Sequence, residues 1–115
     1  MYRAVAYLAM QQDVHWDDES ALGQLAAGLQ LEFRDDAVFI DGVDISQAIR
    51  EPEVTDNIHH VADNLLVREA LVLLQRQLAQ VGNVVTGGRD QGTVAFPAAE
   101  CKIFLTASPQ ERARR

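Results

Sequence analysis

Hydrophobic residues recur at helical spacing through the first 30 positions. Val5, Leu8 and Ala9 fall on one side of a helix predicted over residues 2–11. A second stripe with the i, i+3, i+4, i+7 spacing of a buried helix face consists of Leu22, Leu25, Ala26 and Leu29. Asp17 is predicted to cap this second helix, since its carboxylate can accept hydrogen bonds from the free amides of a first turn.

The period changes to that of strands between residues 31 and 45. Leu31 and Phe33 alternate with polar neighbours, and a second apolar run covers residues 38–40. The intervening dipeptides, Asp35-Asp36 and Asp41-Gly42, consist of residue types that accept the backbone angles of tight turns. We therefore expect a small antiparallel sheet here.

In the rest of the chain, patterns typical of helices alternate with short apolar runs typical of strands. Pro52 suits the first turn of a helix. A long helix is predicted over residues 65–80 from the stripe Val67, Leu71, Leu74 and Leu78, with Gly82 as its stop. The short apolar runs at residues 83–86 and 102–106 are predicted to be buried core strands. The pattern indicates an α/β fold in which the antiparallel sheet is an insertion.

Composition narrows the class of protein. The chain has 115 residues, the size of one small domain, and its net charge of −7 argues against broad binding to nucleic acids or membrane surfaces. We find no apolar run near the roughly 20 residues of a membrane span and no secretory leader, so a cytoplasmic location is expected. The single cysteine, Cys101, forms no internal disulfide and is expected to be a small packed thiol.

The glycine-rich segment GGRDQGT, residues 87–93, is the strongest chemical candidate. It follows an expected strand, where α/β sheets place ligands, and it puts the guanidinium of Arg89 beside the carboxylate of Asp90. The alternative is an ordinary turn with a surface ion pair. His59-His60 is better explained as structural or surface, since adjacent helical side chains diverge by about 100° and rarely share one metal ion. A Walker A motif is absent from these 115 residues.

Several segments, in the same order, are similar to bacterial cytidylate kinase, the CMP/dCMP kinase family. These are MYRAVAYLA, VFIDGVDISQAIREPEV, VREALVLLQRQLA and GGRDQGTVAFPAAECKIFLTASPQERARR. The resemblance covers essentially the whole chain and implies a partial P-loop nucleoside-monophosphate kinase domain over residues 1–115, with a monophosphate-binding insert at about residues 31–63. The resemblance also implies that the chain is a central fragment of such a domain. The family has a Walker A loop before the position that matches Met1, and it continues into an arginine-rich lid after the position that matches Arg115.

The resemblance carries roles to particular residues. Arg3 and Arg89 match arginines that contact the substrate phosphate, and Arg68 and Asp90 match residues that read the edge of cytosine. Counting back from Arg68 without gaps, a cytosine-binding serine of the family falls at His59. The lid would begin with Arg112, Arg114 and Arg115.

Two departures from the family pattern concern this pocket. Gly87 stands where the family usually has an aspartate near the phosphates, and His59 stands where it has the serine. Imidazole can donate or accept a hydrogen bond, so His59 remains a candidate contact to the base.

Two functions stay open at this point. The chain represents an enzyme that moves a phosphoryl group from ATP to CMP or dCMP, or it is a non-catalytic module that binds a pyrimidine monophosphate or only packs against partners. The resemblance implies ATP and Mg²⁺ for the full-length family, but we assign to this chain no cofactor, catalytic residue or metal ligand. We expect the isolated chain to lack turnover and to self-associate through incomplete sheet edges.

Overall fold

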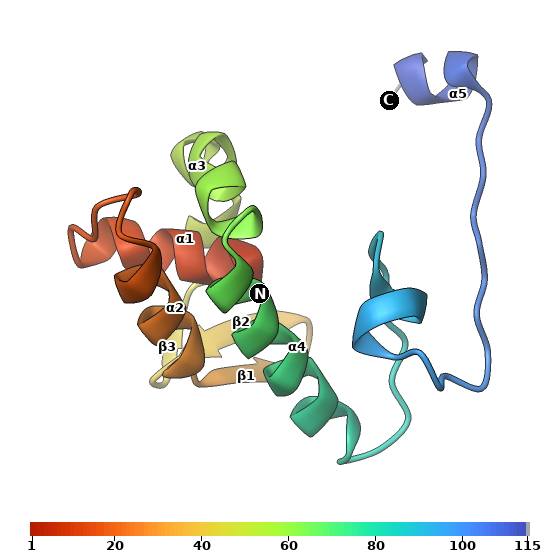
Figure 1. Cartoon of the computed structure of the whole chain (residues 1–115), viewed down its shortest axis with the longest axis horizontal. Helices are drawn as coiled ribbons and strands as arrows, with labels where there is room; N and C mark the ends of the chain where they lie inside the picture. Colours follow the sequence, from red (N-terminus) through yellow and green to blue (C-terminus); the bar gives the residue numbers. More distant parts are fainter. Residues whose placement is uncertain (115) are drawn as a thin grey trace. The chain divides into compact units, whose positions relative to one another are not determined.

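The computed structural model describes residues 1–114. Along the sequence the chain divides into two compact units, with the boundary between Gly82 and Asn83. The first unit contains four helices, α1 (Tyr2–Gln11), α2 (Glu19–Ala27), α3 (Pro52–Ala62) and α4 (Leu65–Ala79), a short 3₁₀ turn η1 (Ala48–Arg50), and strands β1 (Leu31–Arg34), β2 (Ala37–Ile40) and β3 (Val43–Asp44) (Figure 1). The second contains a π-helical turn η2 (Gln91–Ala95) and α5 (Pro109–Arg114).

The predicted helix over residues 2–11 is confirmed as α1, and its end has a clear local cause. Asp13 adopts a φ of 51°, the left-handed conformation that stops a helix. The amide of Val14 then donates to the carbonyl of Ala9 at 2.9 Å, and that of Asp13 donates to Met10 at 3.4 Å. These two bonds form a Schellman motif, so the last carbonyls of α1 are satisfied before the chain turns toward α2.

Side-chain caps start α2 and α4. Asp18 Oδ1 accepts a hydrogen bond from the amide of Ala21 at 2.9 Å, so the expected cap at Asp17 is wrong by one residue. The side chain of Asn64 caps α4 by accepting from the amide of Val67. The expected stop at Gly82 is also wrong, because α4 ends at Ala79 with Gln80 as a right-handed C-cap. Helix ends depend on which turn still has packing partners, and that information is not local.

The predicted antiparallel sheet is confirmed, in the order β1-β2-β3. Arg34 pairs with Ala37 and Ile40 pairs with Val43, so each hairpin has a two-residue loop. The loop residues all have positive φ, at Asp35 (47°), Asp36 (66°), Asp41 (50°) and Gly42 (79°). Two consecutive positive φ values define the type I′ turn, whose twist matches that of the flanking strands.

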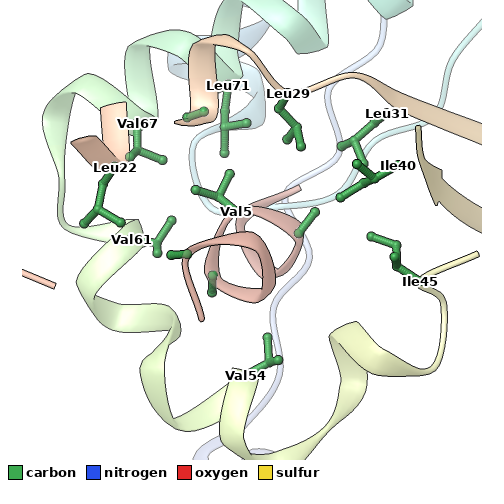
Figure 2. Packing of buried hydrophobic residues seen from close by; sticks show 14 residues of the cluster. Val5, Leu22, Leu29, Leu31, Ile40, Ile45, Val54, Val61, Val67 and Leu71 are labelled. Atoms are coloured by element: carbon green, nitrogen blue, oxygen red, sulfur yellow. The ribbon is translucent and has the colours of Figure 1, made fainter. Parts of the chain in front are cut away.

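The core of the first unit surrounds α1. Val5, Ala6 and Ala9 are fully buried, and these mostly small side chains let neighbouring elements approach the helix closely. Helix α1 packs against α2 and α3, while α4 packs against α2 and α3. Figure 2 shows Val5 near the centre of the buried cluster, whose labelled members also include Leu22, Leu29, Leu31, Ile40, Ile45, Val54, Val61, Val67 and Leu71.

The second unit departs from the sequence-based expectation. Neither of the expected core strands, 83–86 and 102–106, is formed among the described residues. Val85 is 104% exposed and Phe104 is 91% exposed. A run of consecutive apolar residues is buried as a strand only inside a sheet covered on both faces, and the described part of this unit has no sheet to receive it. Cys101, expected to be packed, is exposed for the same reason.

Candidate functional site

Arg3 is the best-anchored of the predicted site residues. It lies on α1, is half-buried, and donates two hydrogen bonds through Nη1, to the carbonyl of Ile49 at 3.0 Å and to Thr55 Oγ1 at 2.8 Å. The Thr55 hydroxyl in turn donates to the carbonyl of Glu51 at 3.2 Å. Both bonds are donated by Nη1, so these two partners fix the orientation of the guanidinium.

His59 lies one turn after Thr55 on α3, and its ring is held from two sides. Its Nδ1 lies 2.8 Å from the backbone carbonyl oxygen of Asp56. Its ring centroid is 3.9 Å from that of His60, which stacks on the indole of Trp16 at 5.2 Å with an interplanar angle of 13°. The His59 and His60 rings are tilted by 37° and do not stack; His59 is exposed, whereas His60 is half-buried against Trp16.

Arg68 lies in the first turn of α4, across the α3–α4 junction from His59. Its side chain is half-buried, and its amide donates to the carbonyl of Asn64 at 3.1 Å. Asn64 anchors this junction, because its Nδ2 also donates to the carbonyl of Glu19 at 3.0 Å. The first unit therefore holds Arg3, His59 and Arg68 on packed helices rather than on loops.

Arg89 and Asp90 belong to the second unit. Their loop is closed by a hydrogen bond of 2.8 Å from Thr86 Oγ1 to Gln91 Oε1, and the carbonyl of Asp90 accepts the amide of Val94, also at 2.8 Å. Arg89 is exposed and Asp90 is half-buried. The loop thus presents the Arg89 guanidinium outward from a closed turn.

The two glycines before Arg89 differ in their surroundings. A Cβ on Gly88 would lie 2.9 Å from Cγ of Gln91, so the closed loop favours glycine there. A Cβ on Gly87 would meet no heavy atom within 4 Å. The glycine at position 87 is therefore not required by packing within the described residues, and the aspartate of the family pattern would fit.

Two ionisable groups of the first unit have shifted pKa values. Burial, assisted by the nearby charge of Arg3, lowers the pKa of the Met1 amino group. Hydrogen bonds from Ser46 lower the pKa of the Asp44 carboxyl, whose Oδ1 accepts from the Ser46 amide at 2.8 Å. The Ser46 hydroxyl accepts from the amide of Val38 at 2.8 Å, so this cluster closes the third strand onto the second.

The remaining candidate features of the sequence carry less chemistry. Within residues 1–114, no group of three or more His, Cys, Asp or Glu side chains is arranged to hold a metal ion. Arg114 pairs with Glu111 at 3.0 Å, Arg112 is exposed, and Arg115 lies outside the described residues. None of the described helices is both long and apolar enough to span a membrane.

A groove of about 390 Å³ lies elsewhere in the first unit, between α1, α2 and the end of β2. Its walls include Leu8, Gln12, Leu25 and Asp41, and none of the predicted site residues. The candidate site is therefore defined by its anchored side chains and not by this groove.

Sequence reasoning missed the residues that support the site. Thr55 lies 52 positions from Arg3, and the carbonyl of Ile49 carries no side-chain signal at all. Trp16 is the only tryptophan of the chain, a hint that it has a packing role, but no local pattern pairs it with His60. These partners exist only because α1, α3 and the segment before α2 meet in space.

Comparison of the sequence with known proteins identifies its family. The sequence model described as "Cytidylate kinase" matches residues 1–115. The chain belongs to the cytidylate kinase family. It is 51% identical over 115 residues to the cytidylate kinase of Rhodopirellula baltica and 50% identical over 120 residues to that of Pelotomaculum thermopropionicum. The relative from Streptococcus mutans is 49% identical over 121 residues.

These matches cover the whole chain but only 50% to 53% of each relative. The chain thus spans about half the length of the curated cytidylate kinases that it matches. The family resemblance stated from the sequence is confirmed, and the described structure of mixed helices and a small antiparallel sheet is compatible with a fragment of such a kinase domain.

Proposed function

We propose that this chain supplies the part of a cytidylate kinase that binds the nucleoside monophosphate, CMP or dCMP. The observation that carries the proposal is the anchored guanidinium of Arg3, in a chain that matches the family along its full length. An arginine fork held by protein acceptors on one side can offer two parallel hydrogen bonds to a phosphate on the other. Pre-orientation lowers the entropy cost of that contact.

The remaining roles follow the family resemblance. Arg89 is proposed as a second phosphate contact, while Arg68, Asp90 and His59 are proposed to meet the edge of cytosine. Cytosine presents two acceptors, O2 and N3, and one donor, the exocyclic amine. A guanidinium and a carboxylate together complement that pattern, and a base without the matching groups would leave them unpaired.

We propose further that the isolated chain does not catalyse transfer. Phosphoryl transfer depends on positioning the donor triphosphate and on stabilising its developing charge, and the 115 residues contain no Walker A loop. We therefore assign donor binding and Mg²⁺ coordination to no residue of this chain. CMP-dependent consumption of ATP by the purified chain, followed in a coupled assay, would overturn this part of the proposal.

Self-association is a further part of the proposal. The segments around Val85 and Phe104 expose consecutive apolar residues, and an exposed apolar segment is a template for association with another chain. Light scattering over a concentration series is expected to show a mass that rises with concentration. A constant monomer mass would contradict it.

Calorimetric titration of the chain with CMP, UMP and AMP tests nucleotide binding. Selective binding of CMP is the expected result. Arg3→Lys keeps the charge but removes the fork, and it is expected to weaken CMP binding at least tenfold, about 1.4 kcal/mol. Arg50→Lys is the matched control, because Arg50 is exposed on η1 and belongs to none of the proposed contacts.

Two results would count against the proposal. Equal losses for Arg3→Lys and Arg50→Lys would remove Arg3 from the phosphate site. Failure of all three nucleotides to bind would favour the alternative, a module that acts only by packing against partners.

A further inference from the structure

One nitrogen of the Arg3 guanidinium is fully engaged by the protein. Nη1 carries two hydrogens and has two acceptors, the carbonyl oxygen of Ile49 at 3.0 Å and Thr55 Oγ1 at 2.8 Å. The other N–H groups of the planar guanidinium are on Nε and Nη2. Within residues 1–114, neither of these two nitrogens has a hydrogen-bond partner. The donors that remain for a ligand are therefore those of Nε and Nη2.

These remaining donors lie along one edge of the guanidinium plane. The hydrogen of Nε and one hydrogen of Nη2 are parallel there, and such a pair matches two oxygens of a phosphate group. The alternative fork, between Nη1 and Nη2, has no free hydrogen on Nη1 while Ile49 and Thr55 hold it. A phosphate that leaves both protein contacts in place can therefore use only the edge formed by Nε and Nη2.

The hydroxyl of Thr55 is itself oriented by α3. A threonine hydroxyl has one hydrogen, and here it is donated to the carbonyl of Glu51, four residues earlier, at 3.2 Å. The amide of Thr55 donates to the same carbonyl, also at 3.2 Å. Since its hydrogen is committed, Oγ1 can only accept in any further contact, and Arg3 is the donor. Thr55 has no hydrogen left for a phosphate, so any effect it has on a bound phosphate passes through Arg3.

The two acceptors of Arg3 come from different elements. The carbonyl of Ile49 belongs to η1 and Thr55 belongs to α3, while Arg3 lies on α1. A single hydrogen bond leaves a planar group free to swing about its acceptor, and a second acceptor from another direction removes that freedom. Arg3 is half-buried and Thr55 is exposed, so the pair lies where a ligand can reach it.

We propose that Thr55 is a positioning residue for the phosphate contact: by holding Nη1 together with the Ile49 carbonyl, it presents the Nε–Nη2 edge of Arg3 to the monophosphate. The inference rests on the proposed function, since it takes Arg3 to bind the phosphate of CMP or dCMP. A fork that is already oriented loses less conformational entropy when the phosphate arrives. Removing the Thr55 acceptor should therefore weaken binding although Thr55 never touches the ligand.

Calorimetric titration of CMP into variants of the chain tests the proposal. Thr55→Val keeps the branched shape and removes the hydroxyl, and it is expected to weaken CMP binding about threefold to tenfold, the value of one hydrogen bond. Thr55→Ser restores the acceptor and should bind CMP like the unmodified chain. Asn57→Ala is the matched control, because Asn57 also bonds to a carbonyl four residues earlier on α3, that of Glu53, and belongs to none of the proposed contacts.

A double-mutant cycle separates positioning from a general structural effect. Lysine has a single nitrogen and no fork to orient. In an Arg3→Lys background, Thr55→Val should therefore cause no further loss of CMP affinity. A loss that comes only from disturbed packing of α3 would persist in that background.

NMR of the unmodified chain reads the predicted edge directly. Addition of CMP should shift the Nε–H resonance of Arg3. An unshifted Nε–H resonance in the CMP complex, an unchanged CMP affinity in Thr55→Val, or a loss that persists beside Arg3→Lys would each overturn the inference and leave the proposed function standing. If the unmodified chain does not bind CMP, the proposed function fails and the inference fails with it.

Discussion

Replacing Asn64 tests how the junction between α3 and α4 is held. Asn64 is 5% exposed, and it is the one polar side chain buried in the core of the described residues. Its Oδ1 accepts from the amide of Val67 at 3.2 Å and its Nδ2 donates to the carbonyl of Glu19 at 3.0 Å. One side chain therefore caps α4 and ties it to the start of α2.

The structure separates these two contributions. Loss of an N-cap costs about 1 kcal/mol, and loss of a hydrogen bond between elements costs about 1 kcal/mol more. Asn64→Ala removes both and should lower the free energy of unfolding by about 2 kcal/mol. Asn64→Ser keeps a capping oxygen but cannot reach Glu19, so its cost should be about 1 kcal/mol.

Urea unfolding monitored by the fluorescence of Trp16 provides the assay, because Trp16 packs on α3 through His60. With a slope near 1 kcal/mol per molar, Asn64→Ala should lower the midpoint by about 2 M. Asn57→Ala is the matched control, since its Nδ2 bonds only to the carbonyl of Glu53 within α3. A midpoint for Asn64→Ala that equals that of Asn57→Ala would refute the reasoning.

Three further changes probe packing, turns and ionisation. A Cβ on Gly23 would lie 2.6 Å from the Cβ of Leu66. Gly23→Ala should therefore push α2 away from α4 and lower the free energy of unfolding in urea by about 1–3 kcal/mol. An unchanged midpoint would contradict the close approach of the two helices. Asp36→Gly should raise stability by about 0.5–1 kcal/mol, because its φ of 66° suits glycine, and thermal unfolding will show whether it does. Ser46→Ala should raise the pKa of Asp44 toward 3.8 in an NMR titration. A carboxyl pKa that is lower in the folded state stabilises the fold at neutral pH, and this stabilisation disappears as the pH falls through the lowered pKa. The variant should therefore lose less stability on acidification than the unmodified chain.

Local sequence patterns predicted most of the first unit. Hydrophobic spacing predicts three of the four helices and the sheet, Pro52 indicates the start of α3, and Asp35-Asp36 and Asp41-Gly42 predict both hairpin turns. The cap at Asp17 and the stop at Gly82 were wrong by one and by a few residues, because several neighbouring positions could serve equally well. The structure then selects the position at which packing ends.

The expected core strands show the limit of the same patterns. Apolar runs such as 83–86 report that residues are suited to burial, but a strand exists only when a second strand accepts its hydrogen bonds. That partner is not part of any local pattern. The second unit accordingly has the composition of core strands while its described residues form none.

The candidate site divides in the same way. The sequence alone determined which residues could do chemistry, namely the arginines, Asp90 and His59, and the family to which the chain belongs. Only the tertiary structure decided that Arg3 is held by Thr55 and the carbonyl of Ile49, and that His59 is held by Asp56 against the His60–Trp16 stack. The physical reason is that a residue type sets what a side chain can donate or accept, whereas its orientation depends on partners that the fold brings from distant parts of the chain.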